Sequence, residues 1–217
     1  MARILLAALV LMIGTAAAAV AAGGPGSPPI PQSACLPEHV PGSDGWPVAA
    51  IYLHGWFPPS GPVDVRGSRA LEIANRAALS ELARRHRIRI AAPLARQVNA
   101  GGMLQWGDAE LPEIERSAMQ ACRITRLPGR LTVIGFSNGG YKARDLGLLP
   151  CEQLDRYARI LAIGTQESFP PRCNGKFRNI PEHRFPPDDL AGLLGLPSRP
   201  GGPLQQAEDQ PPAQPGD

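Results

Sequence analysis

The sequence predicts an α/β fold, with a mostly parallel sheet of about five or six strands flanked by helices on both faces. Two observations predict it. The chain contains several short apolar runs that are typical of buried strands, and between them lie longer segments in which apolar residues recur every three or four positions. Strand–helix–strand connections of this kind join parallel strands, and the helices then cover the sheet. Active sites of such sheets lie at the carboxyl ends of the strands, so the residues that follow each strand matter most.

The expected elements follow one another in a regular order. Apolar runs predict strands at residues 47–53, 88–93, 131–135 and 159–164, with a weaker one at 176–180. Helices are expected at residues 68–86, 110–125, 138–149, 152–158 and 187–195. The stretch "GGMLQWGD", residues 101–108, is expected to form a loop.

The first two of these helices show a clear apolar spacing. In the first, the stepped positions are Leu71, Ala74, Ala78 and Leu82. In the second, they are Leu111, Ile114, Ala118 and Cys122. Residues three and four apart share one face of a helix, so we expect both sets to pack against the sheet.

Both ends of the chain differ in composition from its centre. Residues 1–21 have a charged start, an apolar core and a small-residue end, which is the layout of a secretory signal peptide. An uncleaved membrane anchor is the alternative, and the small residues favour cleavage. The Pro/Gly-rich leader at 22–34 and the Pro/Gly/Gln-rich tail at 197–217 cannot form a core. We therefore expect one domain at residues 35–196 in a secreted or periplasmic protein, without stable membrane contact after signal removal.

The four cysteines predict disulfides, because an exported chain folds under oxidising conditions. Three pairings are possible for four cysteines. We favour Cys35 with Cys122 and Cys151 with Cys173, since the second pair would clip a loop near the proposed site. No cysteine pair has zinc-ligand spacing, so a metal is not expected. The net charge of +3 is spread along the chain, and no basic run predicts nucleic-acid binding.

The stretch "VIGFSNGG" holds the strongest catalytic signal. Ser137 follows a predicted strand and precedes a predicted helix, and Gly135 and Gly139 complete a G-x-S-x-G pattern. A turn this sharp forces the serine into a strained conformation, and glycine at the flanking positions removes collisions that side chains would cause. The serine oxygen is then raised at the amino end of a helix, where backbone N–H groups stabilise an anion. The alternative is a glycine-rich turn with an inert serine.

The stretch "YLHGW" ends the first predicted strand and predicts the second half of an anion site. The backbone N–H groups of Trp56 and Asn138 are expected to converge on the charge that develops during acyl transfer. His54 is expected to support this loop rather than to act as the base. An ordinary exit from a strand is the alternative.

A catalytic serine needs a base to take its proton, and four histidines are present. His39 lies in the leader region, His86 ends a helix among arginines, and His54 precedes the serine by a long way. His183 remains, after the weak last strand and before the closing helix, as the chain order Ser…acid…His requires. A surface loop histidine is the alternative.

The base in turn needs an acid that orients it. Glu167 lies just past the fourth predicted strand and is the best candidate. Asp155 lies on the short helix before that strand, and Asp188 and Asp189 follow the histidine.

Four stretches, "IYLHGW", "VIGFSNGG", "LAIGTQESFPP" and "IPEHRF", fall in the order of the α/β-hydrolase superfamily. Together with "QWGD", the chain most resembles secreted polyhydroxybutyrate depolymerases and feruloyl esterases. The resemblance covers nearly all of residues 47–195 and implies a carboxylic ester hydrolase with Ser137 as nucleophile, His183 as base and Glu167 as acid. It also implies an oxyanion hole from Trp56 and Asn138. The chain departs from the family in its short interval from Ser137 to His183 and in the Glu at the acid position.

Three functions are therefore considered. The first is an exported serine esterase that acts on a small-molecule or polymer ester without a cofactor, with Phe57 and Trp106 among the residues that contact an apolar or aromatic acyl group. The second is an inactive binding domain of the cell envelope that keeps the scaffold, which the shortened carboxyl-terminal half favours. The third, an envelope-tethered protein, requires that the apolar amino terminus is retained.

Overall fold

The computed structural model describes residues 28–61, 64–165, 173 and 175–197 of this chain. Its main strands are β1 (Ala34–Leu36), β2 (Val48–Leu53), β3 (Arg89–Ala92), β6 (Leu131–Phe136), β7 (Tyr157–Ile163) and β8 (Phe177–Ile180). Two further strands, β4 (Gln97–Val98) and β5 (Leu104–Gln105), form a separate ribbon. The α-helices are α1 (Ser68–His86), α2 (Leu111–Cys122), α3 (Asn138–Leu146) and α4 (Leu190–Leu193). Short 3-10 turns are η1 (Ser43–Gly45), η2 (Val65–Gly67) and η3 (Cys151–Leu154).

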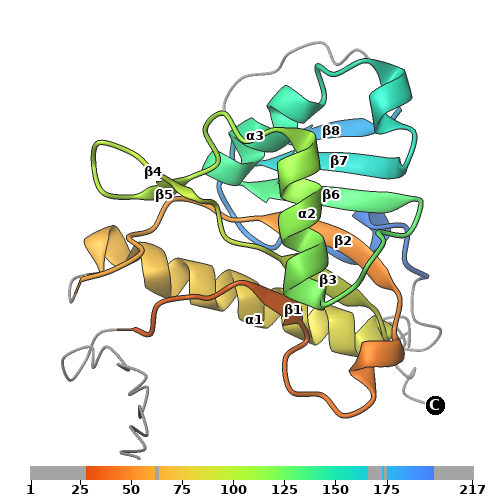
Figure 1. Cartoon of the computed structure of the whole chain (residues 1–217), viewed down its shortest axis with the longest axis horizontal. Coiled ribbons are helices and arrows are strands. Elements are labelled where there is room, and N and C mark those ends of the chain that lie inside the picture. The colour runs from red at the N-terminus through yellow and green to blue at the C-terminus, as the bar shows by residue number, and fades with distance from the viewer. Residues whose placement is uncertain (1–27, 62–63, 166–172, 174, 198–217) are drawn as a thin grey trace, which may run out of the picture.

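The main sheet has six strands in the order β1-β3-β2-β6-β7-β8 (Figure 1). β1 is antiparallel to β3, and every other pair of neighbours in this sheet is parallel. The carboxyl ends of β2, β6, β7 and β8 therefore meet at one edge of the sheet. The prediction of an α/β fold with a mostly parallel sheet is confirmed.

Apolar residues cover both faces of this sheet, as expected of parallel strands that are buried on both sides. All six residues of β6 are buried. Residues of β7 alternate between the two faces, with Ile160 and Ala162 packed beside α2 and α3, and Leu161 and Ile163 packed beside α1 and α4. The helices thus form a layer on each side of the sheet, and the sheet divides the hydrophobic core into two parts.

Most of the expected strands and helices are present, including the weak strand at residues 176–180. Three segments differ. Residues 101–108 contain β5, which pairs with β4, and Ala34, the last residue of the expected leader, already pairs in β1. The expected helix at residues 152–158 is instead the turn η3 followed by the start of β7. These elements contain only two to four residues each, too few to show a period in the sequence.

The predicted buried face of α1 is wrong. Leu71 is 45% exposed, although it begins the apolar series. The buried face carries polar and charged side chains as well as two apolar ones, and its members are Arg69, Glu72, Asn75, Arg76, Leu79 and Ala83. Hydrogen bonds among these side chains and to nearby backbone carbonyls compensate for most of their burial. An apolar periodicity in the sequence does not reveal such bonds. For α2, the prediction is confirmed, because Ile114, Ala118 and Cys122 are buried.

Both favoured disulfide pairings are confirmed. Cys35 in β1 is bonded to Cys122 at the end of α2, and their Cα atoms are 4.6 Å apart. Cys151 is bonded to Cys173, with a Cα–Cα distance of 5.5 Å. Two disulfides are compatible with an extracellular protein.

The predicted signal peptide, residues 22–27 of the leader and nearly all of the tail lie outside the described residues. In the described part, the helices are too short or too polar to cross a bilayer.

Replacing Cys35 and Cys122 by alanine removes a cross-link between residues 87 positions apart. Because this cross-link restricts the unfolded chain, we expect the variant to lose about 4 kcal/mol of unfolding free energy, measured by urea unfolding. The matched variant without Cys151 and Cys173, which are 22 positions apart, is expected to lose about 1 kcal/mol less. A loss below about 1 kcal/mol for the first variant would contradict the expectation.

Candidate active site

Ser137 lies between the end of the central strand β6 and the start of α3. Its φ and ψ angles are 52° and −114°, a conformation that a non-glycine residue rarely adopts. Its N–H donates to the carbonyl of Ile163 at 2.9 Å, and its carbonyl accepts from the N–H of Tyr141 at 3.0 Å. The neighbouring strand and the first turn of the helix therefore hold the strained serine in place.

The glycines on either side of Ser137 let three pieces of backbone approach closely. A Cβ atom at Gly135 would lie 2.0 Å from the carbonyl oxygen of Gly139. A Cβ atom at Gly139 would lie 2.0 Å from the carbonyl oxygen of Leu53 at the end of β2. No side chain fits at either position without moving backbone, so the sequence pattern around the serine has a direct steric cause.

His54 is a fixed, neutral support at the end of β2. It is fully buried, and its Nε2 accepts from the N–H of Ala95 at 2.9 Å, which places the ring proton on Nδ1. Nδ1 then donates to the carbonyl of Gly55 at 2.5 Å. Burial lowers the pKa of His54 to about 3. The ring therefore stays neutral at ordinary pH and holds the loop that contains Gly55 and Trp56.

The structure places Phe57 and Trp106, the two predicted substrate contacts, in the core and outside the cavity lining. Phe57 is fully buried and Trp106 is 2% exposed. Their rings pack on the imidazole of His54, with centroid distances of 4.8 and 5.1 Å. An aromatic side chain on a loop is removed from water more completely when it packs on this buried ring than when it lines an open cavity wall. Loop position in the sequence does not distinguish these two locations.

Trp106 joins the β2 loop to the serine turn. Its indole N–H donates to the carbonyl of His54 at 3.1 Å, and its backbone N–H donates to Oδ1 of Asn138 at 2.9 Å. The same His54 carbonyl accepts from the N–H of Gly139 at 3.0 Å. These bonds fix the loop after β2 and the first residues of α3 relative to each other.

The two predicted oxyanion donors lie on the segments that these bonds connect. Asn138 is the first residue of α3, and Trp56 follows Gly55 in the β2 loop. Within the described residues, the backbone N–H groups of Trp56 and Asn138 have no hydrogen-bond partner. N–H groups at a helix start that lack an internal partner are suited to an anion.

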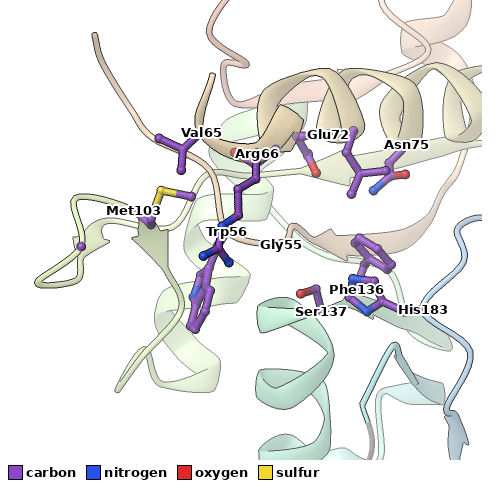
Figure 2. A pocket seen from close by; sticks show the side chains of 13 residues that line it. Gly55, Trp56, Val65, Arg66, Glu72, Asn75, Met103, Phe136, Ser137 and His183 are labelled. Carbon is purple, nitrogen blue, oxygen red and sulfur yellow. The ribbon is translucent and has the colours of Figure 1, made fainter. Parts of the chain in front are cut away.

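His183 follows β8 and lines the same cavity as Ser137. Its Nδ1 lies 3.4 Å from the carbonyl oxygen of Gly164, and its ring packs on Phe136 at a centroid distance of 4.9 Å. Among the described residues, no hydrogen bond joins it to Ser137. Figure 2 shows the Ser137 hydroxyl pointing to the side of the cavity where Trp56 lies, with His183 on the other side of the serine. Rotation of the serine side chain between staggered positions is needed to turn the hydroxyl toward the ring.

Glu167, the predicted acid, lies outside the described residues. The three carboxylates considered as alternatives have other partners. Asp155 pairs with Lys176 at 3.5 Å, and Asp188 pairs with Arg184 at 3.2 Å. Asp189 accepts from the N–H of Gly192 at 3.0 Å and begins α4.

A cavity of about 410 Å³ opens in front of Ser137 (Figure 2). Its apolar wall includes Trp56, Val65, Leu71 and Met103, and its polar wall comes from α1 and the turn before it. No group of three or more His, Cys, Asp or Glu side chains in the described part of the chain is arranged to hold a metal ion.

The sequence interpretation missed the polar wall. Glu72 and Asn75 line the cavity and are buried. Glu72 accepts from Nε of Arg76 at 2.7 Å and from the hydroxyl of Tyr52 at 2.9 Å, and Asn75 donates to that hydroxyl at 3.3 Å. Burial raises the pKa of Glu72, and the nearby Arg76 opposes this effect. The spacing of Glu72 and Arg76, four apart on a helix, was the available signal for an ion pair.

Comparison with family models, with curated proteins and with solved structures finds no match for this chain.

Gly139→Ala tests the steric cause of the serine pattern. We expect it to lower the free energy of unfolding by about 2–4 kcal/mol, because the new methyl group meets backbone. Gly45→Ala is the matched control, since a Cβ atom there meets nothing within 4 Å. Chemical denaturation of both variants measures the difference, and equal stabilities would show that the close approach is not required.

The buried neutral His54 predicts a pH dependence of stability. A histidine whose pKa is about 3 when folded and 6.5 when unfolded takes up a proton on unfolding between these values. Stability is therefore complete above pH about 6.5 and is lost as the pH falls toward about 3. When the pH is lowered from 7 to about 4.5, the free energy of unfolding of the native chain is expected to fall by about 2–3 kcal/mol more than that of His54→Gln. Urea unfolding at each pH measures this difference. Parallel pH profiles would contradict this, as would an NMR signal showing that the folded ring titrates near pH 6.

Proposed function

We propose that this chain is a serine hydrolase of carboxylic esters with an α/β-hydrolase scaffold. One observation carries the proposal: Ser137 is held in a strained conformation after the central strand, at the start of a helix, and faces a cavity that His183 also lines. Chemistry at a serine in this position needs unoccupied N–H donors beside it, and Trp56 and Asn138 provide them.

The sheet supports the scaffold assignment. The serine follows β6, which lies between β2 and β7, and the oxyanion loop follows β2 and precedes α1. In α/β-hydrolases, the donors come from the residue after the nucleophile and from a loop between a strand and the next helix. The positions of Asn138 and Trp56 agree with that arrangement.

In the proposed reaction, the Oγ atom of Ser137 forms a bond to the ester carbonyl carbon while His183 takes the hydroxyl proton. The negative charge on the carbonyl oxygen is stabilised by the N–H groups of Trp56 and Asn138. The C–O bond to the alcohol then breaks, and His183 returns the proton to the leaving oxygen. Water adds to the acyl-enzyme with His183 as base again, and the acid is released. Glu167 is the proposed acid that orients the base.

The neighbouring contacts favour the assignment of the base. The carbonyl of Gly164 lies 3.4 Å from Nδ1 of His183 and suits a ring that carries its proton there. Nε2 is then the nitrogen that can accept a proton from the serine. The apolar wall formed by Trp56, Val65 and Met103 suits a mainly apolar acyl group.

The second candidate function is a binding domain without catalysis, located in the cell envelope. The absence of a hydrogen bond between Ser137 and His183 among the described residues favours it. The two functions differ in the reactivity of the serine, because only an activated serine reacts with a fluorophosphonate probe.

Ser137→Ala is expected to abolish ester hydrolysis, because it removes the nucleophile. We expect kcat/KM for 4-nitrophenyl butyrate to fall at least about a thousand-fold, with the cavity and the stability unchanged. Ser33→Ala, a change remote from the cavity, is the control for nonspecific effects. Equal rates of native and Ser137→Ala protein would exclude the esterase, and a folded native chain that fails to react with the probe would favour the binding domain.

A further inference from the structure

We propose that Arg66 selects esters that carry a second, negatively charged group, such as the hemi-esters of dicarboxylic acids. The inference rests on the proposed function and names a substrate class for the same cavity. Among the described residues that line the cavity, Arg66 alone carries a guanidinium or ammonium group.

The backbone directs this side chain over the cavity. Arg66 has φ and ψ angles of 55° and 28°, in the left-handed region, and it interrupts the turn η2 just before α1. The following Gly67 also has a positive φ, of 68°. This left-handed conformation, which the chain also shows at Arg87, Arg123 and Arg130, sets the direction in which the Arg66 side chain leaves the turn. Figure 2 shows the guanidinium beside Trp56, on the side to which the Ser137 hydroxyl points.

The charge of Arg66 is not balanced by a carboxylate of the described residues. Asp64, the nearest acidic residue in the chain, accepts hydrogen bonds from the N–H groups of Arg69 and Ala70 at 2.7 and 3.1 Å and from the hydroxyl of Ser68. It is therefore occupied at the start of α1. Glu72, the one carboxylate that the described part of the chain contributes to the cavity lining, is paired with Arg76.

The chemistry of the cavity follows from this arrangement. Of the charged groups that described residues contribute, the Glu72 carboxylate is paired with Arg76 inside the wall, while the Arg66 guanidinium faces the space in front of the serine. A guanidinium presents two parallel N–H groups that match a carboxylate, and Arg66 is exposed on the cavity lining, where an incoming carboxylate can reach it. An acyl chain with a terminal carboxylate can thus place its ester at Ser137 and its charge at Arg66.

The test compares two esters of similar length, mono(4-nitrophenyl) glutarate and the neutral 4-nitrophenyl hexanoate. For the native chain, we expect the ratio of kcat/KM values, charged over neutral, to be about five- to tenfold higher than for Arg66→Gln. The difference between native and Arg66→Gln proteins should lie mainly in KM for the charged ester. About 0.5 M NaCl should make this difference smaller, because salt screens the charge pair. Arg66→Lys, which keeps the charge without the paired N–H groups, should recover part of the ratio.

Arg87→Gln is the matched control. Arg87 also has a positive φ, of 51°, and it lies at the opposite end of α1, outside the cavity. The Arg87→Gln variant should have the same ratio of kcat/KM values for the charged and neutral esters as the native chain. Equal ratios in native and Arg66→Gln proteins, with both esters hydrolysed, would overturn the charge selection while leaving the esterase intact.

A binding measurement keeps the two proposals separate even if hydrolysis fails. Calorimetric titration of Ser137→Ala with monomethyl glutarate requires no turnover. We expect binding that weakens about five- to tenfold when Arg66→Gln is added. Failure of the native chain to hydrolyse either ester, together with Arg66-dependent binding, would overturn only the proposed reaction. Binding that does not depend on Arg66 would overturn the charge selection.

Discussion

The N–H of Gly139 donates to the carbonyl of His54 at 3.0 Å, and the same Cα approaches the carbonyl of Leu53 so closely that no side chain fits there. This contact connects the first turn of α3 to the end of β2, two segments that are far apart in sequence. It sets the position of Ser137 relative to the loop with Gly55 and Trp56. Around it, the Trp106 indole and the Asn138 amide add further hydrogen bonds, so the backbone groups that face the cavity are fixed by buried structure.

The sequence was sufficient to predict the features that local physics controls. The strained serine with its glycines and the fold class follow from residue types and from spacing along the chain. The cysteine count predicted disulfides but left three pairings possible, and the structure confirms the two that were favoured. His183 was chosen as the candidate base by elimination and chain order, and the structure places it in the lining of the cavity that contains Ser137. The sequence could not place Phe57 and Trp106, because whether a loop aromatic faces solvent or a buried imidazole depends on tertiary packing. The apolar spacing also predicted the wrong buried face for α1.

That face shows how the fold uses polar residues. Tyr52 of β2 and Glu72, Asn75 and Arg76 of α1 are joined by hydrogen bonds. Together they pack the helix on the sheet, and Glu72 and Asn75 also supply one wall of the cavity. An apolar face would hold the helix equally well, but it would leave the cavity without polar groups on that side. The network therefore connects the stability of the domain with the character of its cavity, and the turn that contains Arg66 is positioned by the same helix.

The edge strand β1 has a consequence for the folded chain in a reducing environment. It contains only Ala34–Leu36 and covers the outer hydrogen-bonding groups of β3, and Cys35 at its centre is tethered to α2. If that tether is cut, a segment this short separates easily, and the exposed edge of β3 becomes a template for strands of other molecules. In a thiol-rich compartment, loss of this cover would favour self-association through the edge of β3, so we expect the Cys35–Cys122 bond to protect the chain from aggregation as well as from unfolding.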